Sequence, residues 1–284
     1  MQVRPATPDD IPTMAAILDA SNESIGWPDM PGWPYLEHLV HRATTAVAIG
    51  RDASVVGFGG AIEAGPLDGN AARWLTDLFV HPDRREVGAG GAILDHLLDG
   101  ASHRMTASTG DRRALSLYIR AGMRPWWPFL YLSGDAARLP GDDVITIELA
   151  DVETTATWSR TWSGRDRTAD FGHYASLPDA SGFTIRDAGS VAAVGWARRD
   201  RRSTSRWLDH VSIAPDADPV RAVLAAWHAA APDGGRVRGV VPGPHPAVAP
   251  MLERGIRILD RDTFCATDPG LLDPVRILPN PGFL

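Results

Sequence analysis

The chain has 284 residues, of which 44% are hydrophobic, so it is long and apolar enough to fold around two ordinary domain cores. Its 28 lysines and arginines and 35 aspartates and glutamates give a formal net charge of −7, and no basic run is long enough to follow a nucleic-acid backbone. The single cysteine, Cys265, excludes an internal disulfide framework and is expected to be packed rather than reactive; no metal-binding set is visible. Because no segment approaches the roughly eighteen apolar residues of a membrane span, we expect a cytoplasmic, soluble protein.

The first half alternates predicted strands and helices. The helix expected over 7–22 begins with a good N-cap, Thr7, and the helix over 111–123 ends at Gly122, which tolerates the left-handed backbone that often follows a helix. Such alternation predicts a layered α/β or α+β fold. The other predicted elements are strands over 2–6, 45–50, 54–65, 73–82 and 128–134, and a helix within 87–101.

An internal repeat divides the chain. The segment RWLTDLFVHPD (73–83) reappears as RWLDHVSIAPD (206–216), and at the same shift ALSLYIRAGM (114–123) falls on AVAPMLERGI (247–256). A third pair, RDASVVGFGGA and RDAGSVAAVGWA, follows at nearly the same spacing. We interpret the chain as a tandem duplication with domains at 1–137 and 138–284, joined in the turn-rich segment ARLPGDD.

A glycine-rich turn, RREVGAGG, follows the strand over 73–82. Free backbone N–H groups and the dipole at a helix start favour an anion, glycines leave room for a diphosphate, and Arg85 adds positive charge. The turn is not a dinucleotide-binding fingerprint, because Ile93 occupies its third glycine position, and it lacks the Gly-Lys-Ser/Thr of a P-loop. Since the second copy keeps the strand but not these glycines, we expect them to serve a ligand rather than the fold.

Three pieces of the first half, LFVHPD, RREVGAG and ALSLYIRAGM, together resemble the GNAT N-acetyltransferases, which use acetyl-CoA. The third piece is similar to the family pattern A-x-x-L-Y-x-x-x-G-F, with Met123 in place of Phe. The resemblance covers the whole first half and implies acetyl-CoA as the cofactor. Together with the repeat, it implies two tandem GNAT-like lobes, each a mixed, mostly antiparallel sheet flanked by helices.

The resemblance also implies which residues meet the cofactor. Tyr118 falls on the tyrosine that protonates the departing thiolate, and a phenol with a pKa near ~10 is protonated at neutral pH. Asp111 stands where the family often has an asparagine near the pantetheine. The remaining implied contacts are the strand that pairs with the pantetheine, Leu78, Phe79 and Val80, and the pyrophosphate turn, Arg85, Glu86, Val87, Gly88, Ala89 and Gly90.

The sequence indicates the general base and the acceptor site less specifically than the cofactor site. Asp77, Glu63 and His81 are the candidate bases, each of which is also compatible with a structural role. The segment 24–38 carries Trp27, Trp33 and Tyr35, and this aromatic character suits an amine with an apolar body. The same aromatic residues also suit a hydrophobic lid or a contact between lobes.

The second half lacks the glycine-rich turn and the tyrosine that are expected to meet the cofactor in the first half. Ten residues separate Pro82 from Ala92, but only seven separate Pro215 from the matching Ala222, and the shorter turn DADPVRA has no glycine. Pro219 removes a backbone N–H, and Met251 stands in place of Tyr118. We therefore expect a degenerate lobe that braces the first or shapes its substrate site.

The sequence predicts an acetyl-CoA-dependent N-acetyltransferase that transfers an acetyl group to a primary amine of a small molecule by direct attack in a ternary complex. It would act as a monomer or homodimer, with no metal, nucleic acid or membrane partner. Two alternatives stay open. One is transfer of a longer acyl group or transfer to a hydroxyl, and the other is an acyl-CoA-binding sensor without turnover.

Overall fold

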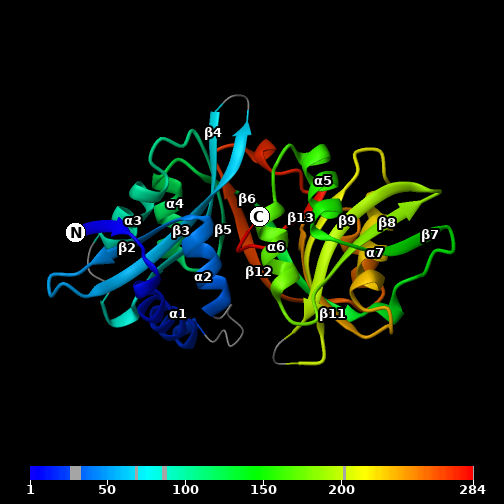
Figure 1. The fold of residues 1–284 in the computed structure, drawn as a ribbon, viewed down its shortest axis with the longest axis horizontal. Helices are drawn as coiled ribbons and strands as arrows, with labels where there is room; N and C mark the ends of the chain where they lie inside the picture. Colours follow the sequence, from blue (N-terminus) through cyan, green and yellow to red (C-terminus); the bar gives the residue numbers. More distant parts are fainter. Residues whose placement is uncertain (26–32, 68–69, 85–87, 201–202, 284) are drawn as a thin grey trace. The chain divides into compact units, whose positions relative to one another are not determined.

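The computed structural model describes the chain except residues 26–32, 68–69, 85–87, 201–202 and 284 (Figure 1). The chain folds into two compact units, and each unit is assembled from segments that are not continuous in the sequence. The first unit consists of Met1–Pro125, Cys265–Asp268 and Pro281–Leu284, and the second of Trp126–Phe264 and Pro269–Asn280.

The sheet of the first unit has the order β1-β2-β3-β4-β5. Its neighbouring strands are antiparallel, except that β4 and β5 are parallel. Short 3₁₀ turns at Pro8–Asp10 and Pro82–Arg84 precede α1 and α3. The elements are β1 (Gln2–Pro5), α1 (Ile11–Ile25), α2 (Trp33–Arg42), β2 (Thr44–Ile49), β3 (Val55–Leu67), β4 (Asn70–Val80), α3 (Ala89–Leu97), β5 (His103–Ser108) and α4 (Arg112–Arg120).

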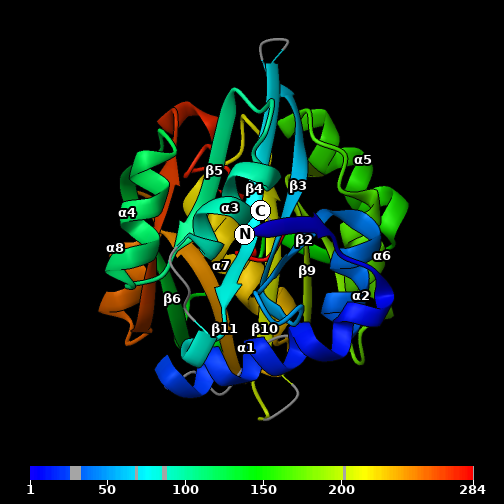
Figure 2. The same cartoon turned by 90° about the vertical axis from the view of Figure 1, so that its left-hand side faces the viewer.

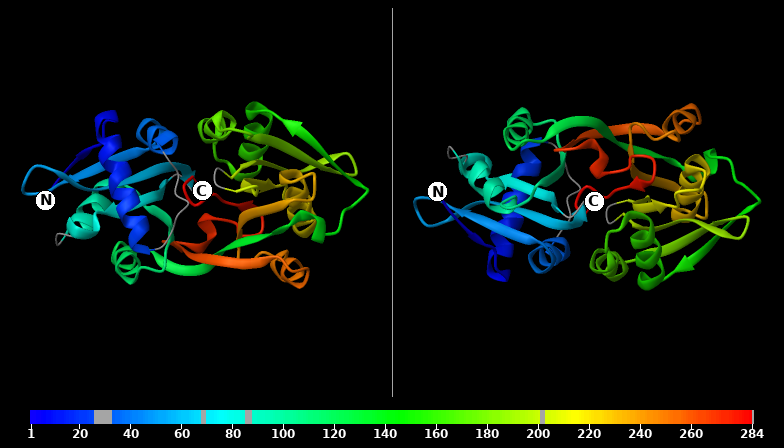
Figure 3. Two further views of the ribbon diagram at one scale, coloured as in Figure 1. Left: turned by 90° about the horizontal axis from the view of Figure 1, so that it is seen from below. Right: turned by 90° about the horizontal axis from the view of Figure 1, so that it is seen from above.

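Helices cover both faces of this sheet. A Cβ on Gly60 of β3 would lie within 2.9 Å of Leu39 in α2, whereas one on the adjacent Gly59 would lie 2.9 Å from both Ile93 and Leu97 in α3. Because successive strand residues face opposite sides, α2 and α3 pack on opposite faces. Figure 2 shows α3 lying across β3 and β4, and Figure 3 shows α1 crossing the strands.

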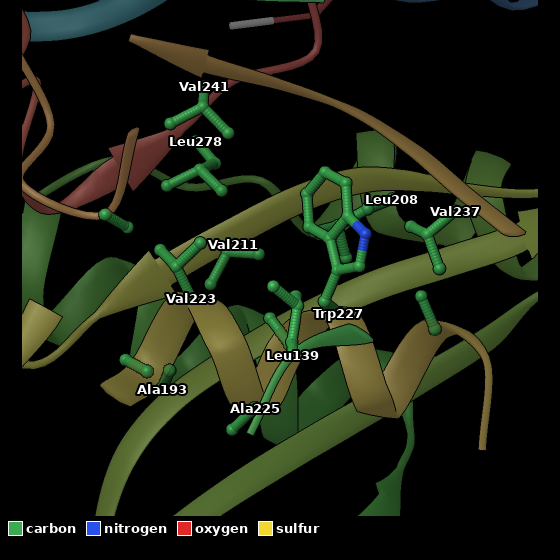
Figure 4. Packing of buried hydrophobic residues seen from close by; sticks show 14 of the residues in the cluster. Leu139, Ala193, Leu208, Val211, Val223, Ala225, Trp227, Val237, Val241 and Leu278 are labelled. Carbon is green, nitrogen blue, oxygen red and sulfur yellow. The ribbon is translucent and has the colours of Figure 1, made fainter. Parts of the chain in front are cut away.

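The second unit repeats this plan with the sheet order β6-β11-β10-β9-β8-β7, and β13 pairs with β10. Its core gathers around α7, where Val211, Val223, Trp227, Val241 and Leu278 are buried together (Figure 4). The elements are β6 (Arg124–Asp135), β7 (Ile145–Ala150), α5 (Val152–Ser163), α6 (Thr168–Ser176), β8 (Ser181–Asp187), β9 (Ser190–Arg199), β10 (Arg206–Ile213), α7 (Pro219–Ala230), β11 (Arg236–Pro242), α8 (Val248–Glu253), β12 (Arg257–Ala266) and β13 (Ile277–Leu278).

Residues that repeat in the sequence perform the same structural tasks. Arg73 donates from Nη1 to the carbonyl of Leu97, the last residue of α3, at 2.7 Å. Arg206 donates from Nε to the carbonyl of Ala230, the last residue of α7, at 3.0 Å. Each arginine thus satisfies a carbonyl at a helix end, where no intrahelical donor is available. The repeat is therefore a repeat of structure.

The two halves also exchange strands. Trp126–Asp135 of β6 lies in the second unit and pairs with β11, whereas the end of β12 lies in the first unit, where Thr267 donates its N–H to the carbonyl of Arg104 at 3.0 Å. The predicted boundary at 137/138 follows the sequence period, which carries no information about such pairing. The expectation for Cys265 is confirmed: it is buried in β12, and burial raises its pKa to about 11.

Candidate active site

The sheet of the first unit opens between β4 and β5. Their parallel pairing runs from Ala72 opposite His103 to Leu75 opposite Thr106 and ends there. The pairing of β4 with β3 shifts register at this point and leaves Thr76 as an extra residue. From Asp77 to Val80, β4 pairs with β3 and with no other strand of the described residues. The other edge therefore offers main-chain groups to a ligand.

A helix N-terminus follows this edge. Gly88 caps α3 with φ +100°, and its carbonyl accepts the first α-helical hydrogen bond, from the Ala92 N–H, at 2.9 Å. The N–H groups of Ala89, Gly90 and Gly91 precede that bond and have no acceptor inside an α-helix, so they suit an anion. Arg85, Glu86 and Val87, which were predicted to join this turn, lie outside the described residues.

Gly88 and Gly90 occupy their positions in the turn for different physical reasons. Gly88 adopts a left-handed backbone conformation that disfavours residues with a side chain, so the expectation that the fold needs none of these glycines is wrong at this position. A Cβ on Gly90 would make only ordinary contacts, at 3.6 Å with Leu117 and 3.9 Å with Val80. Packing therefore does not explain Gly90, and its backbone is open to the approach of a ligand.

Asp77 is a buried carboxyl on the α2 side of β4. It lies opposite Gly60, is 7% exposed, and accepts a hydrogen bond from the hydroxyl of Tyr35 in α2. Burial raises its pKa from the ordinary 3.8 to about 6, and the hydrogen bond from Tyr35 limits that rise. A carboxyl with this pKa is mostly ionised at neutral pH, the state in which it can accept a proton.

The other candidate bases are engaged elsewhere. Glu63 is largely exposed and pairs with Arg73, with 3.0 Å between its Oε1 and the arginine Nε. Arg73 precedes Asp77 by four residues on β4, so Glu63 lies further along the sheet. His81 accepts the backbone N–H of Asp83 at Nδ1, over 3.2 Å. Burial and position favour Asp77 as the base.

Tyr118 lies on the opposite side of the sheet from Asp77. It is near the end of α4, is 6% exposed, and packs in the cluster that contains Ile93 and Leu94 of α3. Leu78 of the open edge packs against the same cluster. The predicted acid and the predicted base therefore approach β4 from its two faces.

The remaining predicted site residues are dispersed. Asp111 is the N-cap of α4, where its carboxylate accepts the Arg113 N–H at 2.8 Å and forms an ion pair with the same arginine. Trp33 begins α2 and is half exposed, whereas Trp27 lies outside the described residues. Tyr35, predicted to bind substrate, is buried against Asp77, a partner 42 positions away that no local pattern indicates.

In the second unit, the chain itself covers the corresponding strand edge. At the shift that relates Arg73 to Arg206, Leu78, Phe79 and Val80 correspond to Val211, Ser212 and Ile213. There β13 pairs with β10, with Leu278 opposite Val211, and the Ile213 N–H donates to the Arg276 carbonyl at 2.9 Å. Figure 4 shows the Leu278 side chain within the core beside Val241.

The corresponding helix start is also satisfied internally. The Asp218 carboxylate accepts the N–H groups of Val220 at 2.8 Å and Arg221 at 3.2 Å, and Pro219 has no N–H to offer. The Arg276 guanidinium donates to two carbonyls of the turn before α7, those of Ala214 and Ala217. A carboxylate of the chain thus stands where α3 leaves its N–H groups available to an anion.

Comparison with known protein families assigns the first unit. Residues 13–123 match the acetyltransferase (GNAT) family and form a GNAT acetyltransferase domain. The match spans α1 to α4 and includes the open edge, the turn and Asp77. This domain is therefore an acyltransferase domain of the GNAT type, and enzymes of this type take the acyl group from an acyl-CoA.

Solved structures show that the GNAT fold extends over the whole chain. A GCN5-related N-acetyltransferase from Anabaena variabilis matches with a TM-score of 0.64 at 14% identity, covering 93% of this chain and 72% of that one. A tandem GNAT protein from the clavulanic acid biosynthesis pathway matches with a TM-score of 0.61 at 13% identity, covering 94% and 99%. A GCN5-related N-acetyltransferase from Sphaerobacter thermophilus gives 0.59 at 12%, covering 97% and 96%.

No curated protein matches the sequence. The described residues include no helix that is long and apolar enough to cross a membrane. They also include no group of three or more histidine, cysteine, aspartate or glutamate side chains placed to hold a metal ion. The tandem GNAT fold, predicted from the resemblance together with the repeat, is confirmed by the structural matches over both units.

Proposed function

We propose that the first unit transfers an acetyl group from acetyl-CoA to a primary amine of a small molecule, by direct attack within a ternary complex. The observation that carries the proposal is the buried Asp77 beside the strand edge that β5 leaves free. A carboxyl with a pKa of about 6 is ionised at neutral pH and can accept the proton that an ammonium group or attacking amine gives up.

The described residues fit acetyl-CoA in three places. The main chain of Leu78 to Val80 would pair with the pantetheine, the N–H groups of Ala89 and Gly90 would receive the pyrophosphate, and Tyr118 would lie near the sulfur. The exposed Trp33 would contribute to the acceptor side. When bound, acetyl-CoA supplies a thioester whose carbonyl carbon is open to attack.

The residues of the chain then account for both protons. As the amine nitrogen bonds to the carbonyl carbon and the C–S bond breaks, Asp77 takes a proton from the nitrogen. Tyr118 donates its phenolic proton to the departing thiolate and recovers one from water. Because the two side chains lie on opposite faces of β4, the amine can approach from one side while the thiolate leaves on the other.

We further propose that the second unit, which contains most of the second copy of the repeat (138–284), does not bind acyl-CoA. β13 and Asp218 occupy the positions where the pantetheine and the pyrophosphate would bind. Met251, at the position of Tyr118, offers no proton. The unit would instead brace the first or shape its acceptor site.

A titration of the chain with CoA should therefore give one binding site per chain. Isothermal titration calorimetry on the purified protein measures this number directly. Gly90→Ala should lower the CoA affinity of this one site, and the titration should then show no second site that keeps its affinity. Two sites of similar affinity would contradict the assignment of the second unit.

Gly90→Ala should weaken CoA binding about tenfold or more while leaving the fold intact. The added methyl group meets only ordinary contacts in the protein but projects at the helix start that would receive the pyrophosphate. Gly91→Ala is the matched control, because it makes a similar gain in helix propensity one position further into α3. Both variants should melt at or slightly above the temperature of the parent. Equal CoA affinity in both variants would remove Gly90 from the site.

The function is tested by measuring thiol release from acetyl-CoA across a panel of small amines, with Arg85→Ala as the control for cofactor dependence. An N-acetyltransferase releases one CoA for each amide formed, and Arg85→Ala should lower that rate. Binding of acetyl-CoA without release across the panel would indicate the sensor alternative. Faster turnover of longer acyl-CoA donors would indicate the other acyltransferase. Failure of acetyl-CoA to raise the melting temperature would contradict all three.

A further inference from the structure

The last residues of the chain belong to the first unit. Trp74 of β4 is fully buried, and its indole Nε1 donates a hydrogen bond to the carbonyl of Pro281 at 3.0 Å. Trp74 precedes Asp77 by three residues on the same strand. A buried indole N–H needs an acceptor, so this bond fixes Pro281 beside the strand that carries the base.

Phe283 packs against the helix that carries Tyr35. Its ring centroid lies 5.2 Å from that of Tyr35 and 5.2 Å from that of His38, both in edge-to-face geometry. Tyr35 and His38 are three residues apart in α2 and therefore share one face of the helix. Phe283 is 4% exposed. Tyr35 is thus held by Phe283 at its ring and by Asp77 at its hydroxyl.

We propose that Phe283 is a positioning residue for acyl transfer, which holds the Tyr35 ring so that its hydroxyl remains on Asp77 and keeps water from the pair. The proposal rests on the proposed role of Asp77 as the base. A tyrosine side chain turns about two bonds, and an aromatic neighbour restricts both motions. Removing the Phe283 ring would leave a cavity beside Tyr35, and the carboxylate that Tyr35 hydrogen-bonds gives entering water a polar partner.

The electrostatic surroundings of Asp77 make this role measurable. Burial raises its pKa, and hydroxyl hydrogen bonds, with that of Tyr35 foremost, lower it; no charged side chain of the described residues contributes. The titratable side chains of α2 next to this group are Tyr35, which donates to Asp77, and His38, whose ring packs on Phe283. Residues 281–283 carry no ionisable side chain, so changing Phe283 alters solvation and position without altering charge.

The test is an NMR titration of the full-length protein labelled with ¹³C at the aspartate carboxyl carbons, with Asp77→Asn used to assign the signal. The parent should titrate near pH 6. Tyr35→Phe should raise the midpoint, because it removes a hydrogen bond to the ionised form. Phe283→Ala should lower the midpoint toward 3.8, because water that enters the cavity hydrogen-bonds the carboxylate in place of the Tyr35 hydroxyl and also relieves the burial. Phe283→Leu, which preserves most of the packing, should lie between Phe283→Ala and the parent.

Phe171→Ala is the control, because it removes an equally buried ring from the second unit. It should leave the Asp77 midpoint unchanged. A midpoint that does not move in Phe283→Ala, or that moves as far in Phe171→Ala, overturns the proposal. If Phe283→Ala does not fold, the same criterion applies to Phe283→Leu.

Turnover with acetyl-CoA and an accepted amine gives a second readout. Phe283→Ala should lower kcat roughly tenfold and leave the KM for acetyl-CoA within about twofold. The double variant Tyr35→Phe/Phe283→Ala should be no slower than the slower single variant, since Phe283 acts through Tyr35. Multiplicative losses would overturn the proposal. If the parent shows no turnover, the proposed function fails, but the titration still decides the role of Phe283.

Discussion

Asp77→Asn should lower kcat/KM by roughly 10²–10⁴-fold while CoA affinity stays within about twofold of the parent. The asparagine fills the same space but has no basicity, and Asp77 lies on the face of β4 away from the α3 and α4 cluster that would meet the cofactor. The parent rate should fall as the pH drops through about 6, where Asp77 becomes protonated. The variant should lack this acid limb, which is measured from the pH dependence of kcat/KM.

Loss of the fold can be separated from loss of the base. Burial raises the pKa of Asp77 above the 3.8 of an unfolded chain, so the cost of holding its ionised form grows as the pH rises from about 4 to above 6. Asp77→Asn removes this cost and should melt no lower than the parent at pH 8. Glu63→Gln is the matched control, because Glu63 is largely exposed and paired with Arg73. If Glu63→Gln loses as much activity as Asp77→Asn, Asp77 is not the base.

The sequence was informative where structure and chemistry depend on neighbouring residues. The start of α3 after Gly88, the strand before it and the end of α4 could all be placed, because each follows from local backbone preferences. The repeat added information that one copy lacks. Arg73 and Arg206 recur because each satisfies a helix end, whereas Gly90 does not recur and is not required by packing.

Pairings between distant segments could not be predicted in this way. β13 is two residues long, and nothing in its composition indicates that it pairs with β10. The hydrogen bond from Tyr35 to Asp77 and the contact of Phe283 with Tyr35 likewise depend on where the folded chain brings them together. Hydrophobic periodicity identifies the buried face of an element but not its partner.

Tyr118→Phe should lower kcat by roughly 10²-fold or more and leave the dissociation constant of CoA nearly unchanged. The phenylalanine fills the same place in the cluster with Ile93 and Leu94, so the packing of α4 on α3 is preserved. The change removes the phenolic hydroxyl, which would offer a proton to the departing thiolate. Single-turnover kinetics with acetyl-CoA and an accepted amine isolate the chemical step.

The leaving group provides a sharper criterion for the same variant. A thiolate of lower basicity needs less protonation, so an acetyl thioester of an acidic thiol should recover much of the lost rate in Tyr118→Phe but not in Asp77→Asn. Tyr131→Phe is the control, because Tyr131 is a phenol of the second unit whose hydroxyl is held by Asp262 at 2.6 Å. It should leave kcat unchanged. A Tyr118→Phe variant with parental kcat would show that the thiolate leaves without this acid and would reduce Tyr118 to a packing residue, the role that Met251 has in the second unit.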